Sequence, residues 1–197
     1  MQAKTLINES KRNLTMICSL AEFNEYTQNF EDSTEAIKLK TSYLLAAEQI
    51  VSEYLGYNPQ QKIYDESFSG IGDYKLYLHA RPIKVVSELF VNGLAMPLDM
   101  IAVNDDYIYE IFRRRIFLEG LNNIHCSYIA GYSAVEMPEL IKVSIMRIAA
   151  LMLQEQGGNI GLTGKSMGEN SRTFINYSSY EKYLKPLEGL RVIKLVD

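Results

Sequence analysis

Several residue types and features that would indicate a familiar class of protein are scarce or missing. The chain of 197 residues has no tryptophan, two histidines and two cysteines. Cys18 and Cys126 are far apart and match no metal-binding spacing, which favours a reducing compartment, although the sequence alone leaves a disulfide between them open. The longest apolar run, Ile148 to Leu153, is too short for a bilayer span of about 20 residues. We therefore expect neither a metal site nor a membrane span.

An excess of positive charge is also missing. The formal net charge is −4, whereas proteins that bind duplex DNA in general usually carry a basic excess. The first residues, Met1 to Glu9, are too few and too polar for a signal-peptide core, so we expect a protein made in a cytoplasm. With 47% hydrophobic and 22% charged residues, the chain can form one sizeable core, or a core with a smaller inserted lobe. Fourteen tyrosines indicate a wet surface that is rich in contacts.

The stretch GGNIGLTGKS, Gly157 to Ser166, ends like a Walker A phosphate-binding loop. That motif requires its first glycine at position 159, where this chain has Asn159, and Gly158 comes one position too early. The motif also requires a buried strand before it and a helix after it, whereas an apolar helical run precedes this stretch. We therefore predict a flexible loop over residues 157–176 in preference to a nucleotide site.

The N-terminal part of the chain predicts two helices. Ser19 has the properties of an N-cap, and Glu22 occupies the capping-box position of a short helix over residues 20–28. A longer helix of about six turns begins after Ser33 and ends at Gly56. Its apolar residues recur at intervals of three and four: Ile37, Leu44, Leu45, Ala47, Ile50, Val51, Tyr54 and Leu55.

The exposed side of this second helix is expected to carry Glu35 and Glu48. Two further helical segments are expected near the C-terminus. Pro138 begins a run to Gln156 that is apolar nearly all round in its second half, as in a helix at the centre of a bundle. A last amphipathic stretch covers residues 177–187.

Between these helices the apolar period changes from 3.6 to 2, which predicts strands. Two strands flank a turn at residues 70–73, and Asn92-Gly93 is a strong hairpin signal. Pro97 marks an edge or a bulge in the returning strand. The expected strands are residues 62–65, 74–78, 85–91, 94–103, 107–112, 116–118 and 124–130.

The order of elements predicts an α+β fold. About four helices form a helical bundle, and a small antiparallel β-sandwich or barrel-like block is inserted between them. The first part of the bundle covers residues 19–58, the inserted β block covers residues 59–135, and the second part of the bundle, with the C-terminal tail, covers residues 136–197.

No catalytic constellation is found. His125 and Cys126 are neighbours on an expected strand, so their side chains point to opposite faces and cannot pair as base and nucleophile. His79 is expected at a strand end with a structural role, and Asp105-Asp106 is typical of a turn. The sequence has no nucleophile elbow and no zinc-protease motif. We therefore predict a protein that is not an enzyme and needs no cofactor.

The densest basic cluster is Arg113, Arg114 and Arg115. These arginines could contact a phosphate backbone, or they could form the solvated tip of a hairpin, which we favour. Lys165 and Arg172 complete the residues that we consider as possible contacts to DNA or to a neighbouring subunit.

The chain resembles the head-tail connector (adaptor, or head-completion) proteins of tailed bacteriophages, in their longer variety with a β insert. Three segments carry the resemblance in order: SLAEFNEYTQNFEDSTEAIKLKTSYLLAAEQIVSEYLGY (Ser19 to Tyr57), LYLHARPIKVVSELFVNG (Leu76 to Gly93) and CSYIAGYSAVEMPELIKVSIMRIAALMLQEQGG (Cys126 to Gly158). The last segment contains a Tyr-x-x-Gly-Tyr pattern followed by Met-Pro and an apolar helix. Together the segments span most of residues 19–187.

This resemblance implies a structural protein of the virion neck, made in the host cytoplasm. It implies a ring of copies of the chain, commonly twelve, that lies under the portal protein, extends the DNA channel and supports the next neck or tail-completion protein. Genomic double-stranded DNA would pass through without sequence-specific binding.

The resemblance also implies that the C-terminal segment grips the portal. The segment consists of Leu190, Arg191, Val192, Ile193, Lys194, Leu195 and Val196. Its apolar residues need burial from some source, and the alternative is that the tail folds back on its own bundle. A second alternative for the whole chain is a nucleic-acid-binding module that uses its β insert.

Overall fold

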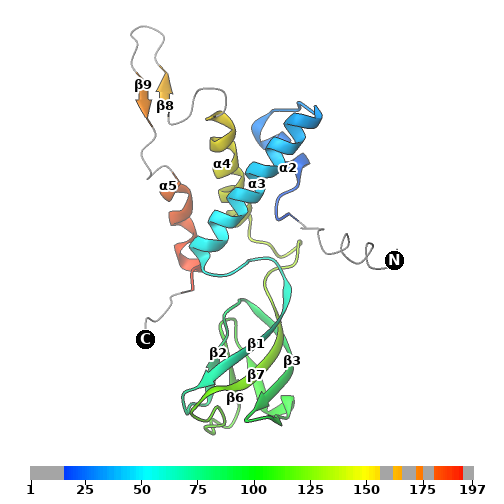
Figure 1. Ribbon diagram of the computed structural model, residues 1–197, viewed down its shortest axis with the longest axis vertical. Helices are drawn as coiled ribbons and strands as arrows, with labels where there is room; N and C mark the ends of the chain where they lie inside the picture. Colours follow the sequence, from blue (N-terminus) through cyan, green and yellow to red (C-terminus); the bar gives the residue numbers. More distant parts are fainter. Residues whose placement is uncertain (1–15, 156–161, 166–171, 175–179, 193–197) are drawn as a thin grey trace, which may run out of the picture. The chain divides into compact units, whose positions relative to one another are not determined.

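The computed structural model describes residues 16–155, 162–165, 172–174 and 180–192 (Figure 1). The described residues form two compact units. The helical unit contains the described residues up to Val51 and from Glu139 to Gly189. The β unit contains Ser52–Pro138 and the described residues from Leu190 onward. The β unit is built from antiparallel sheets and lies between two helical segments of the sequence. The predicted α+β fold, helices with an inserted antiparallel β block, is therefore confirmed.

Helix α2, Leu20–Thr27, begins as the sequence predicts. The Ser19 hydroxyl accepts a hydrogen bond from the Glu22 backbone N–H at 3.2 Å, and the Glu22 carboxylate accepts one from the Ser19 N–H at 2.7 Å. This reciprocal capping box satisfies two backbone donors that the first turn leaves unpaired. The helix ends at Gln28, which adopts the left-handed conformation with φ 53°.

Helix α3, Thr34–Leu55, follows a cap in which Ser33 Oγ accepts from the Ala36 N–H at 3.3 Å. Gly56 ends it at φ +82°, a backbone conformation that glycine adopts without strain. Its fully buried residues include Leu44, Ala47, Val51 and Leu55. The predicted apolar face was too wide at its start, because Ile37 is 38% exposed.

Two charged residues lie on the buried stripe of α3. Glu48, which the sequence analysis placed on the exposed side, is 9% exposed, so that expectation is wrong. Lys40 is 1% exposed, and its Nζ donates to Asn24 Oδ1 at 2.8 Å and to the backbone carbonyls of Asn29 and Glu31 at 2.8 and 2.9 Å. Lys40 therefore holds the link between α2 and α3.

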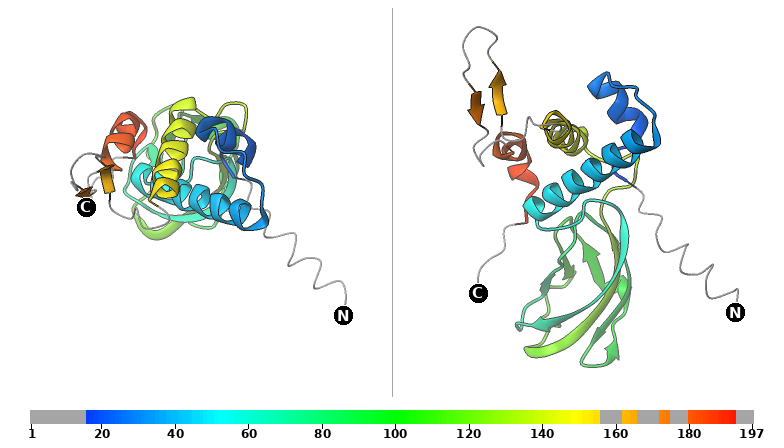
Figure 2. Two further views of the ribbon diagram at one scale, coloured as in Figure 1. Left: turned by 90° about the horizontal axis from the view of Figure 1, so that it is seen from above. Right: turned by 45° about the horizontal axis from the view of Figure 1, so that its top comes forward.

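Helix α4, Glu139–Gln154, buries Ile141, Ile145, Ile148 and Ala149. The second half, which is apolar nearly all round as in a helix at the centre of a bundle, is buried only in part, since residues 151–153 are half-buried. The last described helical turns are α5, Glu181–Leu184, and the 3-10 helix Lys185–Leu190. Within the helical unit α4 contacts both α2 and α5 (Figure 2).

The β unit contains two sheets that share one core. The larger has the order β1-β7-β3-β4, with β1 Lys62–Gly70, β7 Gly120–Ala130, β3 Ile83–Val91 and β4 Leu94–Ala95. The smaller has the order β2-β6-β5, with β2 Lys75–Tyr77, β6 Tyr107–Glu110 and β5 Ile101–Val103. Their buried residues form a single cluster: Phe68, Leu76, Leu78, Ala80, Ile83, Val86, Leu89, Val91, Ile108, Phe117, Ile124, Cys126, Tyr128 and Ala130.

The strand pairing differs from the sequence prediction in two places. Strands β1 and β2, predicted on either side of one turn, belong to different sheets, because β1 pairs with β7 and β2 pairs with β6. The predicted strand over residues 94–103 is split into β4, the 3-10 helix Leu98–Met100 and β5. Pro97 lies at the interruption, where a residue without an N–H cannot donate to a ladder.

The predicted turn at Asn92-Gly93 is confirmed, and a second glycine, at position 131, is also required by the backbone. Asn92 and Gly93 have φ values of 51° and 76°, and they join Val91 to Leu94 in the predicted hairpin. Gly131, in the Tyr-x-x-Gly-Tyr pattern, has φ +101°, and a Cβ there would lie 2.4 Å from the Gln60 carbonyl oxygen. Only glycine fits this position.

Candidate functional site

Each histidine lies beside a carboxylate, and both cysteines are free and buried. His125 Nε2 lies 2.9 Å from Asp65 Oδ1, and His79 Nδ1 lies 3.3 Å from Glu66 Oε2. Cys126 is fully buried, on the face opposite His125 as predicted, and burial raises its pKa to about 12. Within the described ranges no group of three or more His, Cys, Asp or Glu residues could hold a metal ion. None of the helices in these ranges is long and apolar enough to cross a bilayer.

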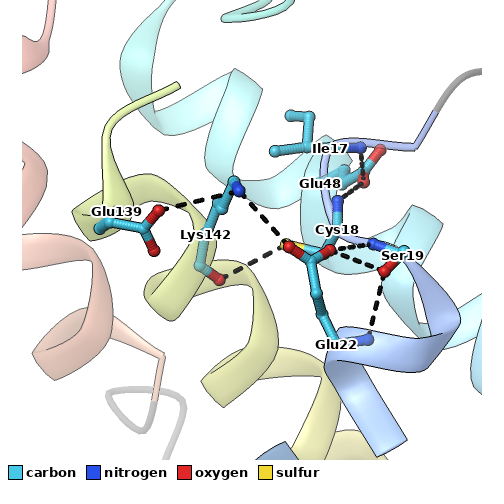
Figure 3. A network of polar contacts seen from close by, with 7 residues as sticks. All are labelled: Ile17, Cys18, Ser19, Glu22, Glu48, Glu139 and Lys142. Carbon is cyan, nitrogen blue, oxygen red and sulfur yellow. Dashed lines mark hydrogen bonds and ion pairs between the residues drawn. The ribbon is translucent and has the colours of Figure 1, made fainter. Parts of the chain in front are cut away.

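A network of polar contacts lies in the helical unit, between the start of α2 and helices α3 and α4 (Figure 3). The Glu48 carboxylate accepts hydrogen bonds from the backbone N–H groups of Ile17 and Cys18 at 2.5 and 3.3 Å. The Cys18 thiol donates to the Lys142 carbonyl at 3.6 Å, and Lys142 Nζ lies 3.4 Å from Glu22 Oε1. Burial, followed by the nearby Glu48 charge, raises the pKa of Cys18 to about 12.

This network fixes the chain before α2 against two helices. Its polar groups bind one another, and its thiol remains protonated at neutral pH, so it has the chemistry of a structural cluster. The sequence contained a signal for Glu48, since it lies four residues after Leu44 and three before Val51, on the stripe that packs inward.

An open groove of about 650 Å3 lies in the helical unit beside α2, α4 and α5. Its lining residues are Tyr26, Thr27, Asn29, Arg147, Ala150, Leu151, Leu153, Gln154 and Tyr183. Arg147 is the one charged residue in this lining, and its guanidinium lies 5.8 Å from the Tyr183 ring centroid. A lone cation that stacks on an aromatic ring gives a contact surface but no acid–base pair.

In the described part of the Walker-like stretch, residues 162–165, the chain forms a strand and does not begin a helix. Gly164 and Lys165 belong to strand β8, Leu162–Lys165, which pairs antiparallel with β9, Arg172–Phe174. A phosphate-binding loop would begin a helix at this point. The loop predicted over residues 157–176 thus contains a short ladder in which Lys165 pairs with Arg172 in the backbone register. Residues 157–161, 166–171 and 175–176 lie outside the described residues.

The three arginines after β6 differ in their contacts. Arg114 Nε donates to Glu110 Oε1 at 2.7 Å, its backbone N–H donates to Glu110 Oε2 at 2.8 Å, and the Glu110 side chain is fully buried. Burial alone would raise the Glu110 pKa, but the bonds from Arg114 outweigh it and hold this pKa below its usual value. Arg113 and Arg115 are exposed and have no ion pair among the described residues. Arg114 therefore has a structural contact, and all three arginines remain candidate contacts to DNA or to a neighbouring subunit.

The described part of the C-terminal segment lies against the end of α3, within the β unit. The Val192 N–H donates to the Leu55 carbonyl at 2.9 Å, and Arg191 Nε donates to the Tyr54 carbonyl at 3.0 Å. The Arg191 guanidinium also lies 4.6 Å from the Tyr54 ring centroid. We call Arg191 and Val192 the C-terminal clip. Since the last carbonyls of a helix have no partner within it, the clip satisfies two of them and places a cation at the negative end of the helix.

Arg81 supports the clip from the loop after β2. Its Nη2 donates to the Arg191 carbonyl, and its Nη1 lies 2.9 Å from Asp106 Oδ1. The Arg81 guanidinium lies 5.5 Å from the Tyr57 ring centroid, and its side chain is 18% exposed. No local pattern in the sequence indicated this role, because its partners are remote along the chain.

Of the seven residues proposed to grip the portal, three can be placed. Leu190 ends the 3-10 helix, and Arg191 and Val192 form the clip. Ile193, Lys194, Leu195 and Val196 lie outside the described residues. Within the described part, the polar groups of Arg191 and Val192 contact the chain itself, at the end of α3.

Comparison with protein-family models gives no match, and comparison with curated proteins gives no significant match. Solved structures do match. One is described as the neck of an empty gene transfer agent (GTA) particle computed with C6 symmetry, at a TM-score of 0.57 and 13% identity, covering 91% of this chain and 92% of that chain. This chain shares its fold with a chain of that neck.

Two further structures give the same result. The neck of a native GTA particle, computed with C12 symmetry, matches at a TM-score of 0.57 and 13% identity over 90% of both chains. The virion of a native GTA particle matches at a TM-score of 0.59 and 12% identity, over 91% of this chain and 92% of that one. At this low identity the similarity establishes the fold alone, and the shared fold extends over nearly the whole of both chains.

Proposed function

We propose that the chain is a structural subunit of the neck of a tailed phage or a phage-like particle. It acts as a head-tail connector that forms a ring under the portal, extends the DNA channel and supports the next neck or tail ring. The observation that carries this proposal is the fold that the chain shares, over about nine-tenths of both chains, with chains of two particle necks and of one virion. The symmetric necks in two of those descriptions favour several copies around one axis.

The electrostatics are compatible with a DNA channel. A net charge of −4 disfavours tight binding of phosphates, and a channel has to let DNA slide. Arg113 and Arg115 are exposed arginines without an ion pair among the described residues, and they could contact passing DNA or a neighbouring copy. If the chain were instead a nucleic-acid-binding module, a salt-dependent affinity for duplex DNA would be lost on Arg113→Ser and Arg115→Ser.

The C-terminal segment is the proposed portal contact. The clip ties Arg191 and Val192 to the end of α3, so the residues that follow start from a defined point on the β unit. Residues 193–196 then supply three apolar side chains and one lysine for the portal. The clip itself is a contact within the chain, and the proposed docking begins after it.

Electron microscopy of the purified chain mixed with the portal of the same particle tests this function. We expect the full chain to add a ring to the portal. A variant that ends at Val192 should keep the thermal unfolding midpoint of the full chain but should no longer bind the portal. No added ring with the full chain contradicts the neck function, and full binding by the shortened variant contradicts only the role of the tail.

A further inference from the structure

The β unit has two exposed sheet faces with opposite chemical character. Since the two sheets share one buried core, each sheet has an outward face of its own. We call the outward face of β2 and β6 the tyrosine face, and the outward face of β1, β7 and β3 the acidic face (strands labelled in Figure 1). Each face follows from the strand register.

The tyrosine face consists of Lys75, Tyr77, Tyr107 and Tyr109. Lys75 pairs with Tyr109 and Tyr77 pairs with Tyr107 across the ladder, while the residues between them are buried. Ring centroids are 5.3 Å apart for Tyr77 and Tyr107 and 5.9 Å apart for Tyr107 and Tyr109, and Lys75 Nζ lies 4.7 Å from the Tyr107 centroid. Tyr77 is 56% exposed. Ordered tyrosine rings are typical of the centres of protein interfaces.

The part of the acidic face proposed for docking consists of Ile63, Asp65, Val85, Glu88 and Ile129. Ser127, His125 and Phe90 lie on the same outward side. Ile63, Ile129 and Val85 form one row across three strands, and Asp65 and Glu88 lie on either side of β7 in the next row. Ile63 is 78% exposed and Val85 is 46% exposed. The face therefore offers an apolar strip beside a pair of carboxylates.

Glu88 carries the free charge of this face. Asp65 is already paired with His125 at 2.9 Å, whereas Glu88 is exposed and has no ion pair among the described residues. The lysine of the tyrosine face likewise contacts tyrosine rings and no carboxylate in the same part of the chain. One face thus presents an unpaired cation with aromatic rings, and the other presents an unpaired anion with aliphatic side chains.

We propose that the tyrosine face of one copy docks on the acidic face of the next copy, with Lys75 opposite Glu88 and the tyrosine rings on Ile63 and Val85. This inference rests on the proposed ring function. The two faces are different surfaces of one chain, so the contact is head-to-tail. A head-to-tail contact repeated around an axis closes a ring when the rotation between copies closes. The partner is a second copy because the complementary charge and apolar surface occur on the same chain.

Single-stranded nucleic acid is the other partner that aromatic rows can bind. Such sites combine stacking rings with a positively charged groove that follows the backbone. The tyrosine face has one lysine and lies on a chain of net charge −4, so the second copy is favoured.

Charge reversal with complementation tests the contact. The wild type, Lys75→Glu and Glu88→Lys are each examined by sedimentation velocity up to the solubility limit. Each single reversal should weaken self-association by about tenfold or more, because it places like charges opposite one another. An equal mixture of the two variants should restore association, since every contact in an alternating assembly then joins opposite charges. Lys38→Glu, an exposed reversal on α3, is the matched control and should associate like the wild type.

The outcomes separate this inference from the proposed function. The wild type could form rings with the portal while both charge-reversal variants assemble as well as the wild type does. This result would overturn the proposed contact and leave the neck function intact. A wild type that stays monomeric at every concentration, or a mixture that fails to restore association, also overturns it. Binding of oligothymidylate by the wild type, lost in Lys75→Glu without any self-association, assigns the tyrosine face to nucleic acid instead.

Discussion

The C-terminal clip gives the sharpest prediction about a single side chain. Arg191→Ala removes the hydrogen bond to the Tyr54 carbonyl and the stacking on the Tyr54 ring, while the main-chain bond from Val192 to Leu55 can still form. The lost hydrogen bond is worth about 1 kcal/mol. The exposed cation–π contact is worth about 0.5–1 kcal/mol. Together they amount to about 2 kcal/mol, a factor of about 30 between the docked and released clip.

Amide hydrogen exchange of Val192 measures this equilibrium directly, because its N–H is the donor to Leu55. We expect exchange at Val192 to accelerate by about the factor derived above in Arg191→Ala. Arg191→Lys should give a smaller acceleration, since it keeps the charge but loses the planar group that stacks. Lys185→Ala, a change at an exposed residue of the preceding 3-10 helix, should leave Val192 unchanged. Unchanged Val192 exchange in Arg191→Ala would refute the role of this side chain.

The remaining predictions concern the helical unit and the thiols. Lys40→Met keeps the apolar stem of the side chain but leaves three oxygen acceptors without their donor. Urea unfolding followed by circular dichroism should show that the free energy of unfolding falls by about 2–4 kcal/mol. The exposed control Lys38→Met should lower it by less than about 0.5 kcal/mol. Cys18 and Cys126, with pKa values of about 12, should resist a thiol reagent at neutral pH in the native protein and react after unfolding; rapid native reaction would contradict their burial. The hydrogen bonds from the Ser19 backbone N–H and hydroxyl hold the pKa of Glu22 below its usual value of 4.5. The ionised Glu22 side chain therefore stabilises the fold fully above pH 4.5, and this stabilisation is lost as the pH falls through the lower pKa of the folded state. When the thermal unfolding midpoint is measured against pH, Glu22→Gln should reduce the fall of the midpoint at acid pH. An unaltered pH dependence would refute this role of Glu22.

Local signals in the sequence predicted the ends of several elements. The capping box at Ser19, the glycine end of α3 at Gly56 and the Asn92-Gly93 hairpin each depend on residues within a few positions of one another. Their conformations are decided by backbone sterics and short-range hydrogen bonds, which the sequence displays directly. For the same reason the α+β order of elements could be predicted from the change of period.

Strand partners could not be predicted in this way. A period of 2 shows that β1 has an inner and an outer face but does not identify β7 as its neighbour, since that choice depends on how the whole core packs. The clip is a further non-local case, because Arg191 and Tyr54 are 137 residues apart. Apolar residues in the tail indicated only a need for burial.

The charged residues on α3 were missed for a different reason. Lys40 and Glu48 lie at helical spacing from Leu44 and share its buried stripe, so their positions were visible in the sequence. Glu48 was predicted to be exposed because it is charged, and this prediction is wrong because its carboxylate accepts a hydrogen bond from the backbone. Lys40, for which no prediction was made, is buried because it donates to backbone carbonyls. A charged residue on an apolar stripe is better treated as a candidate for a structural polar contact.

The place of this chain in the mature particle tests the proposed function most directly. Cryo-electron microscopy of purified particles, averaged over the vertex where the tail joins the head, measures both its position and its copy number. We expect density for the chain repeated as a closed ring between the portal and the tail. Particles that lack the chain, or that carry it as a single copy or away from this vertex, would contradict the account.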